Sequence, residues 1–259
     1  MLRAAEIAKT FDAFFPFEDA CSYDNVGLLV GRAGREVKKA LIALDVTTEV
    51  IKEAKDLGVD LIVSHHPVIF REVKTITDQS YTGMILLSLI ESGIAAIALH
   101  TNFDKGADGN NDVLARKLGA VSYEKIEDGF ATKFDLAEEM SFDAFAKKVK
   151  ETLGDAVIRT IGGGKVKRVI ASCGAGIDEG LILRAKEDGA VIVTADVKHN
   201  YAVMAKDLSV ALVEATHYAS EWGFTQKIKE FMTQRFKNVE LFVSKTNINP
   251  YDFVAREGV

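Results

Sequence analysis

The chain is poor in several residue types, and each scarcity narrows the possible classes of protein. Its 259 residues include only two cysteines and three prolines. Cys21 and Cys173 lie far apart and form no Cys-x-x-Cys motif, a pattern typical of a reducing cytosol. Cys173 follows an apolar run, which favours a buried structural thiol over the alternative of a metal ligand.

The chain also lacks the features of membrane proteins and of proteins with a broad nucleic-acid interface. Its longest apolar stretches, such as residues 94–99, are too short to span a bilayer. The segment from Leu2 to Phe15 has apolar residues at helical spacing among charged ones, which predicts an amphipathic helix rather than a signal peptide. The net charge is −6 and no Lys/Arg cluster stands out, which argues against nucleic acid as a partner. We expect a cytoplasmic protein.

The remaining pattern is an alternation of short apolar strands and amphipathic helices. With 48% hydrophobic residues, the chain can form one large core or two smaller ones. Apolar runs at 40–44, 59–63 and 94–99 are separated by helical patterns, and this order predicts an α/β fold with mixed, largely parallel sheets.

The second half of the chain repeats the pattern of the first half. Three pairs of segments correspond at an offset near 130 residues: 37–42 with 166–171, 53–58 with 184–189, and 62–64 with 192–194. This repetition predicts an internal duplication into two similar α/β lobes, residues 1–125 and 126–259. The part from about residue 210 onward is expected to pack back on the first lobe. The alternative is that any two strand–helix–strand units look alike.

Histidine is scarce, and most of it stands where predicted strands end. Two of the five histidines form His65-His66-Pro67, and two others begin His-x-x-x-carboxylate motifs. Strands of an open α/β sheet carry functional side chains at their carboxyl ends, and imidazole with carboxylate suits transition metals. The candidate ligands are His65, His66, His100, Asp104, His217 and Glu221. Six ligands exceed one tetrahedral site, which predicts two metal ions.

Three further features leave alternatives open. His100 is either a ligand or, as we favour, a residue that orients one and moves protons. His199 either lines the same cleft and transfers protons or is a surface side chain. The run Gly162-Gly163-Gly164 has no following Gly-Lys-Ser/Thr and predicts a turn rather than a phosphate loop.

These motifs together resemble the Nif-three-like family, often labelled GTP cyclohydrolase I type 2 homolog. The resemblance spans nearly the whole chain and rests on motifs that occur in the family's order: Asp24-Asn25-x-Gly27-Leu28, His65-His66-Pro67-x-x-Phe70, His100-Thr-Asn-x-Asp104, Gly109-Asn110-Asn111-Asp112, Thr194-x-Asp196 and His217-Tyr-x-x-Glu221. The chain resembles a short member that lacks the large insertion between the halves. It departs from the family at Ala195 and Thr216, where glycine is usual.

The resemblance implies a two-lobed α/β fold with a dinuclear metal site between the lobes, and a ring-shaped hexamer. The ligands it implies are His65, His66, Asp104, His217 and Glu221, with Glu221 as the bridge. We expect two divalent ions (zinc, iron, manganese or nickel) and a hydrolase for a small nucleotide-like or phosphorylated substrate, with His100 and His199 moving protons. The alternative is a non-catalytic protein of metal binding, metal delivery or partner regulation.

Overall fold

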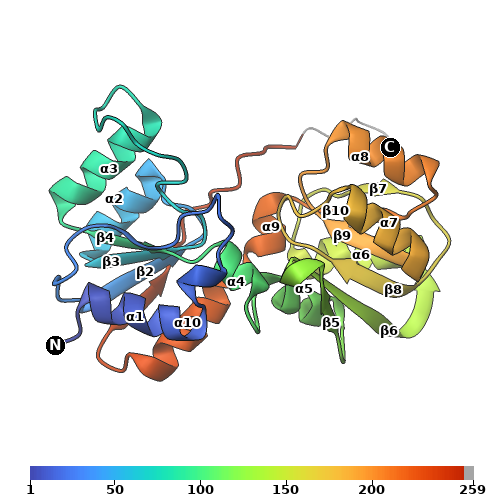
Figure 1. Cartoon of the computed structure of the whole chain (residues 1–259), viewed down its shortest axis with the longest axis horizontal. Coiled ribbons are helices and arrows are strands. Elements are labelled where there is room, and N and C mark those ends of the chain that lie inside the picture. The colour runs from blue at the N-terminus through green and yellow to red at the C-terminus, as the bar shows by residue number, and fades with distance from the viewer. Residues whose placement is uncertain (254–259) are drawn as a thin grey trace. The chain divides into compact units, whose positions relative to one another are not determined.

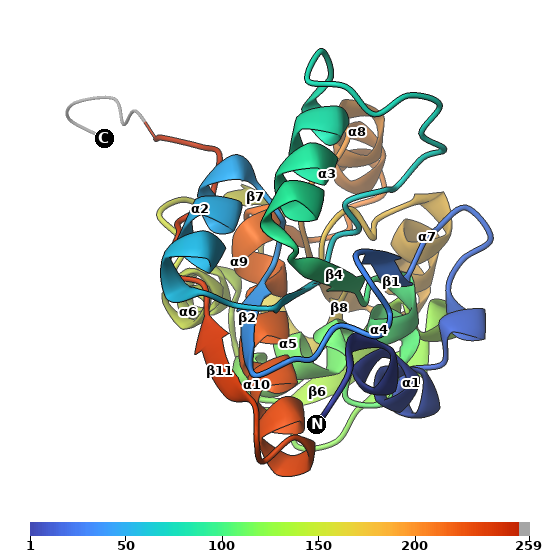
Figure 2. The same cartoon turned by 90° about the vertical axis from the view of Figure 1, so that its left-hand side faces the viewer.

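The computed structural model describes residues 1–253 and divides the chain into two compact units (Figure 1). The first comprises residues 1–107 and 224–248, and the second comprises 108–223 and the segment that begins at Asn249. These bounds differ from the predicted lobes of 1–125 and 126–259. The first unit includes residues from late in the chain because strand β11 (Glu240–Val243) pairs in parallel with β2 (Lys39–Ala43), as Figure 2 shows.

The first unit is a five-stranded sheet with helices on both faces. The strand order is β1-β4-β3-β2-β11, with β1 at Gly27–Val30, β3 at Leu61–Ser64 and β4 at Ala95–Ala98. Helices α2 (Thr48–Leu57) and α3 (Tyr81–Ser92) cover one face, and α1 (Ala4–Phe14) and α10 (Gly223–Arg235) cover the other (Figures 1 and 2). The strands β11, β2, β3 and β4 run parallel, as predicted, and only the edge strand β1 is antiparallel.

The second unit is a six-stranded sheet in the order β5-β6-β8-β9-β10-β7. Its strands are β5 (Glu124–Ile126), β6 (Ala131–Ser141), β7 (Arg159–Ile161), β8 (Lys165–Ala171), β9 (Ala190–Thr194) and β10 (Leu212–Glu214). Its longer helices are α5 (Asn110–Leu118), α6 (Phe142–Leu153), α7 (Glu179–Asp188) and α8 (His199–Asp207). The expectation of a largely parallel sheet is wrong here, because only β8, β9 and β10 run parallel. The long strand β6 pairs antiparallel with both β5 and β8.

The two units share one strand topology. In each, three consecutive parallel strands follow a short strand that returns antiparallel to the third: β1 pairs with β4, and β7 pairs with β10. A glycine follows each short strand where two backbones approach closely. A Cβ on Gly31 would lie 2.7 Å from the Cα of Ala95, and one on Gly162 would lie 2.9 Å from the Cα of Ala211. This common topology supports the hypothesis of internal duplication.

The aromatic residues at the C-terminal end of α1 have contacts within the first unit. Phe14 is exposed, but its ring lies 4.1 Å from the guanidinium carbon of Arg235, and Phe15 is buried. A homo-oligomer stays a prediction. Within residues 1–253, none of the helices is both long and apolar enough to cross a membrane.

Candidate metal centre

The carboxyl end of β3 places His65 and His66 at the edge of the first sheet. The N–H groups of both residues donate to the carbonyl of Leu44, at 3.1 and 2.9 Å. Two consecutive donors to one carbonyl end the regular ladder, so the strict alternation of side chains stops here. The two rings lie on one side, with centroids 4.9 Å apart. Both imidazoles can therefore contribute to one site.

The neighbouring strand β4 supplies His100 and Asp104 through the short helix α4 (Thr101–Lys105). His100 is the N-cap of α4, and its ring centroid lies 5.1 Å from that of His65 and 5.5 Å from that of His66. The potential ligand atoms of these three histidines all lie within 4.8 Å of one another. A carboxylate oxygen of Asp104 lies 3.7 Å from Nε2 of His65. The first unit therefore gathers four of the predicted metal-site residues.

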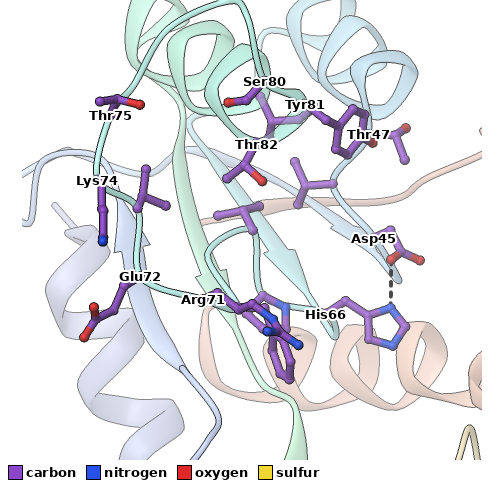
Figure 3. Close-up of a pocket in the computed structure, with 16 residues that line it drawn as sticks. Asp45, Thr47, His66, Arg71, Glu72, Lys74, Thr75, Ser80, Tyr81 and Thr82 are labelled. Carbon is purple, nitrogen blue, oxygen red and sulfur yellow. Dashed lines mark hydrogen bonds and ion pairs between the residues drawn. The ribbon is translucent and has the colours of Figure 1, made fainter.

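Each of the three imidazoles is held by its Nδ1 atom. Nδ1 of His65 lies 2.7 Å from the carbonyl oxygen of Leu99, which can only accept a hydrogen bond. Nδ1 of His66 lies 2.8 Å from a carboxylate oxygen of Asp45 (Figure 3), and Nδ1 of His100 lies 2.9 Å from one of Asp24. In a neutral ring, a proton on Nδ1 places the lone pair on Nε2, the tautomer that binds a metal through Nε2.

Asp24 is a strong anchor for His100. Burial raises the pKa of this carboxyl, but hydrogen bonds from His100, Thr101 and the Asn25 N–H outweigh that effect and lower the pKa to about 2. Asp24 therefore stays ionised at neutral pH and orients the ring of His100. Asp24 belongs to one of the motifs that resemble the family, but its sequence context does not indicate that it orients a histidine.

The second unit supplies His217 and Glu221 on α9 (His217–Glu221), which follows β10. Thr216 caps this helix by accepting the N–H of Ala219 at 3.2 Å. Nε2 of His217 lies 2.9 Å from a carboxylate oxygen of the buried Glu221, as their i,i+4 spacing predicts. Nδ1 of His217 lies 2.7 Å from a carboxylate oxygen of Asp196, so this imidazole is held by the same device as the other three.

Asp196 and Gly174 are functional candidates with no role from the sequence. Asp196 adopts φ +47°, a left-handed conformation uncommon outside glycine, at the turn after β9. Gly174 follows β8 with φ +57°, and a Cβ there would lie 2.2 Å from Oε1 of Glu221 and 3.1 Å from Nε2 of His217. The glycine therefore leaves the space that the His217–Glu221 pair occupies. Its only sequence signal is its place after a predicted strand.

The structure gives the last two candidates different surroundings. His199 begins α8 and is exposed, and among the described residues it contacts no other candidate. Its part in proton transfer stays a prediction. Cys173 is buried, and its thiol donates to the carbonyl of Ser220 at 3.3 Å, in keeping with a structural thiol.

Residues 2–250 match the sequence profile of the family described as Duf34/NIF3 (NGG1p interacting factor 3). The chain belongs to this family. It is 34% identical over 264 residues to a Clostridium perfringens protein named GTP cyclohydrolase 1 type 2 homolog, covering 98% of this chain and all of that relative. It is 33% identical over 234 residues to a Helicobacter pylori protein named GTP cyclohydrolase 1 type 2, covering 90% and 92% of the two chains.

Two solved structures share the fold of this chain. A Staphylococcus aureus hypothetical protein superposes with a TM-score of 0.89 at 29% identity, over 97% of this chain and 99% of that one. Reduced HcgD from Methanocaldococcus jannaschii superposes with a TM-score of 0.83 at 28% identity, over 95% and 98% of the two chains. The alignment with a relative from Staphylococcus aureus is 370 positions long and covers 98% of this chain, which has only 259 residues. The relative is therefore longer, and this chain is a short member of the family.

Proposed function

We propose that this protein is a dinuclear metal-dependent hydrolase that acts on a small nucleotide-like or phosphorylated substrate. The proposed ligands are His65, His66 and Asp104 from the first unit and His217 and Glu221 from the second, with Glu221 as the bridge. This assignment follows the family resemblance and the chemistry of the donor set. Nitrogen and carboxylate donors in this number suit zinc, iron, manganese or nickel.

The observation that carries the proposal is that each of these imidazoles is held through its Nδ1 atom. Four of the chain's five histidines have Nδ1 within 2.7–2.9 Å of a carbonyl or carboxylate oxygen. Metal-binding histidines almost always donate their second ring N–H in this way, which fixes the tautomer and the ring orientation. A surface histidine has no such requirement, and exposed His199 has no such partner among residues 1–253. The donor set therefore fits a metal centre.

Bound divalent ions would supply Lewis acidity and a water of near-neutral pKa. The chain's own groups would then orient the substrate and move protons. His100 is the proposed proton carrier, since it adjoins His65 and His66 and is anchored by ionised Asp24. The same arrangement also suits a metal ligand, so the two roles of His100 are separated by experiment. The Helicobacter pylori relative's name, a GTP cyclohydrolase, supports a nucleotide as the substrate.

The test is elemental analysis of purified wild-type protein and three variants, combined with a hydrolysis screen over nucleotides and phosphoesters. His65→Ala and Glu221→Ala should each lose at least half of the bound metal, whereas Cys173→Ser should retain it because its thiol bonds to a backbone carbonyl. Unchanged metal in both ligand variants would refute the assigned site. Normal metal binding with no turnover above a metal-free control would favour the non-catalytic metal-binding function.

A further inference from the structure

A cavity of about 530 Å³ opens beside His66 within the first unit (Figure 3). This volume lies within the range of small-molecule sites. Its polar lining includes Asp45, Thr47, Arg71, Lys74, Ser80 and Thr82. Figure 3 shows that these side chains come from the turn after β2, from the loop after β3 and from the start of α3. His66 is thus a wall of the cavity as well as a member of the candidate metal centre.

The two basic side chains that line this cavity, Arg71 and Lys74, lie on a long irregular loop. Residues 67–80 connect β3 to α3 without a helix or strand, and loops of this length in compact domains are often binding loops. Arg71 and Lys74 make no ion pair or hydrogen bond with any residue in the described range 1–253. By contrast, several other basic side chains, such as Arg35 and Arg168, have carboxylate partners. Two cations without a protein counter-ion beside a cavity favour an anionic ligand.

The hydroxyl groups of the cavity are compatible with such a ligand, and a histidine contacts one of the two carboxylates in the lining. A carboxylate oxygen of Asp45 lies 2.8 Å from Nδ1 of His66, so this carboxylate orients the imidazole. Glu72 is the other carboxylate of the lining. Ser80 caps α3 by accepting the Gly83 N–H at 3.1 Å, and Thr47 caps α2 by accepting the Val50 N–H at 3.2 Å. Each hydroxyl keeps its own proton to donate. Both helices begin at the cavity, and helix N-termini favour anions.

We propose that this cavity binds the phosphate groups of the substrate, with Arg71 and Lys74 as the principal phosphate ligands and the hydroxyls of Ser80 and Thr82 as further donors. Phosphates bound here would place the rest of the substrate toward His66, where the proposed metal centre lies. The inference therefore rests on the proposed function for the reaction that the bound molecule undergoes. Arginine matches a phosphate with paired N–H donors, and lysine adds a mobile charge. The substrate class is then a phosphorylated molecule, such as a nucleotide, bound through its phosphates.

The test is calorimetric titration of metal-stripped protein with inorganic pyrophosphate at constant ionic strength. The double variant Arg71→Gln/Lys74→Gln should bind at least tenfold more weakly than wild type. The matched control Lys52→Gln/Lys55→Gln removes two exposed charges from α2 and should bind like wild type. Circular dichroism and thermal melting establish that both variants are folded. Absence of binding to wild type, undiminished binding by the cavity variant, or an equal loss in both variants would overturn the inference.

Metal content separates this inference from the proposed function. Because the titration uses metal-stripped protein, binding that depends on Arg71 and Lys74 supports the phosphate site even if wild type carries no metal. Conversely, normal metal content with no pyrophosphate binding rejects the phosphate site and leaves the metal assignment intact. Where the screen finds a substrate, the cavity variant should raise KM at least tenfold with little change in kcat, which is the pattern of lost ground-state binding.

Discussion

Gly174→Ala should damage the metal centre without removing any ligand. A Cβ at this position would lie 2.2 Å from Oε1 of Glu221, far closer than a van der Waals contact, and 3.1 Å from Nε2 of His217. The flexible end of the Glu221 side chain must move, because the backbone of Gly174 is fixed by its N–H, which donates to the Ser220 hydroxyl at 3.0 Å. The added methyl group therefore displaces the carboxylate that we propose bridges the two metals.

Two separate costs follow from this substitution. Alanine in the left-handed conformation of Gly174, at φ +57°, costs roughly 1–2 kcal/mol of folding free energy. For a chain of this size that corresponds to a decrease of about 2–8 °C in Tm. Moving Glu221 should weaken metal binding on the order of 10–100-fold, the loss typical when a group supporting a metal ligand is altered.

Gly189→Ala is the matched control. Gly189 ends α7 at φ +61°, and a Cβ there would meet no atom within 4 Å. The control therefore carries the same backbone cost without the clash. Competition with a chromophoric chelator should show weakened metal binding only in Gly174→Ala, while melting curves fall in both variants. Wild-type metal affinity in Gly174→Ala, with a Tm like that of Gly189→Ala, would refute the placement of Glu221 beside this glycine.

Two other substitutions test the first unit. His100→Ala should keep near-normal metal by elemental analysis and lose about 10²–10⁴-fold in hydrolysis rate if His100 moves protons; metal loss as complete as in His65→Ala would make it a ligand instead. Glu53 accepts hydrogen bonds from the Lys245 N–H and from the Ser244 and Thr246 hydroxyls. Burial raises the pKa of Glu53, but these hydrogen bonds outweigh burial and lower the pKa below its usual value of 4.5. A carboxyl whose pKa is lower in the folded state than in the unfolded state stabilises the fold at pH values above its unfolded-state pKa. This stabilisation is lost as the pH falls through its folded-state pKa. Glu53→Gln should therefore lower the free energy of unfolding at pH 7 by about 1–3 kcal/mol, more than the exposed control Glu230→Gln, with the gap narrowing below pH 4.5 in urea titrations; equal effects of the two variants at pH 7 would contradict the assignment.

The sequence predicted the elements that depend on local patterns. The helix after β2 begins at the Thr47 cap and ends at Gly58 in the left-handed conformation, as its capping residues predict. Ser141 likewise caps the helix that follows it. The sequence predicts that the part from about residue 210 onward packs back on the first lobe, and residues 224–248 belong to the first unit. It does not predict that β11 pairs with β2 or that β6 is antiparallel, because both depend on pairing between distant segments. Periodicity identifies a strand but does not give its partner.

The same limit applies to the candidate site. The histidines and carboxylates that could bind metal stand out in the sequence because they follow strands, but the residues that orient them do not. Asp45 and Asp196 each lie 21 residues from the histidine they hold, and Asp24 lies 76 residues from His100. Aspartate at the end of a strand or in a turn is common, so residue type and position do not show that these three orient histidines. Asp24 and Asp196 stand out in the sequence only as members of the family motifs, and Asp45 belongs to none of them.

The shared topology of the two units also corrects the apparent equivalence of their histidine motifs. Both motifs read His-x-x-x-carboxylate after the third parallel strand, but His100 is the N-cap of α4, whereas His217 is the first helical residue of α9, after the cap Thr216. The N-cap has a non-helical backbone and the following residue a helical one, so the two side chains leave the chain in different directions. If the units arose by duplication, His100 corresponds to Thr216 rather than to His217. The two units would then have acquired His100 and His217 separately. A role inferred for one of these histidines therefore does not transfer to the other by symmetry.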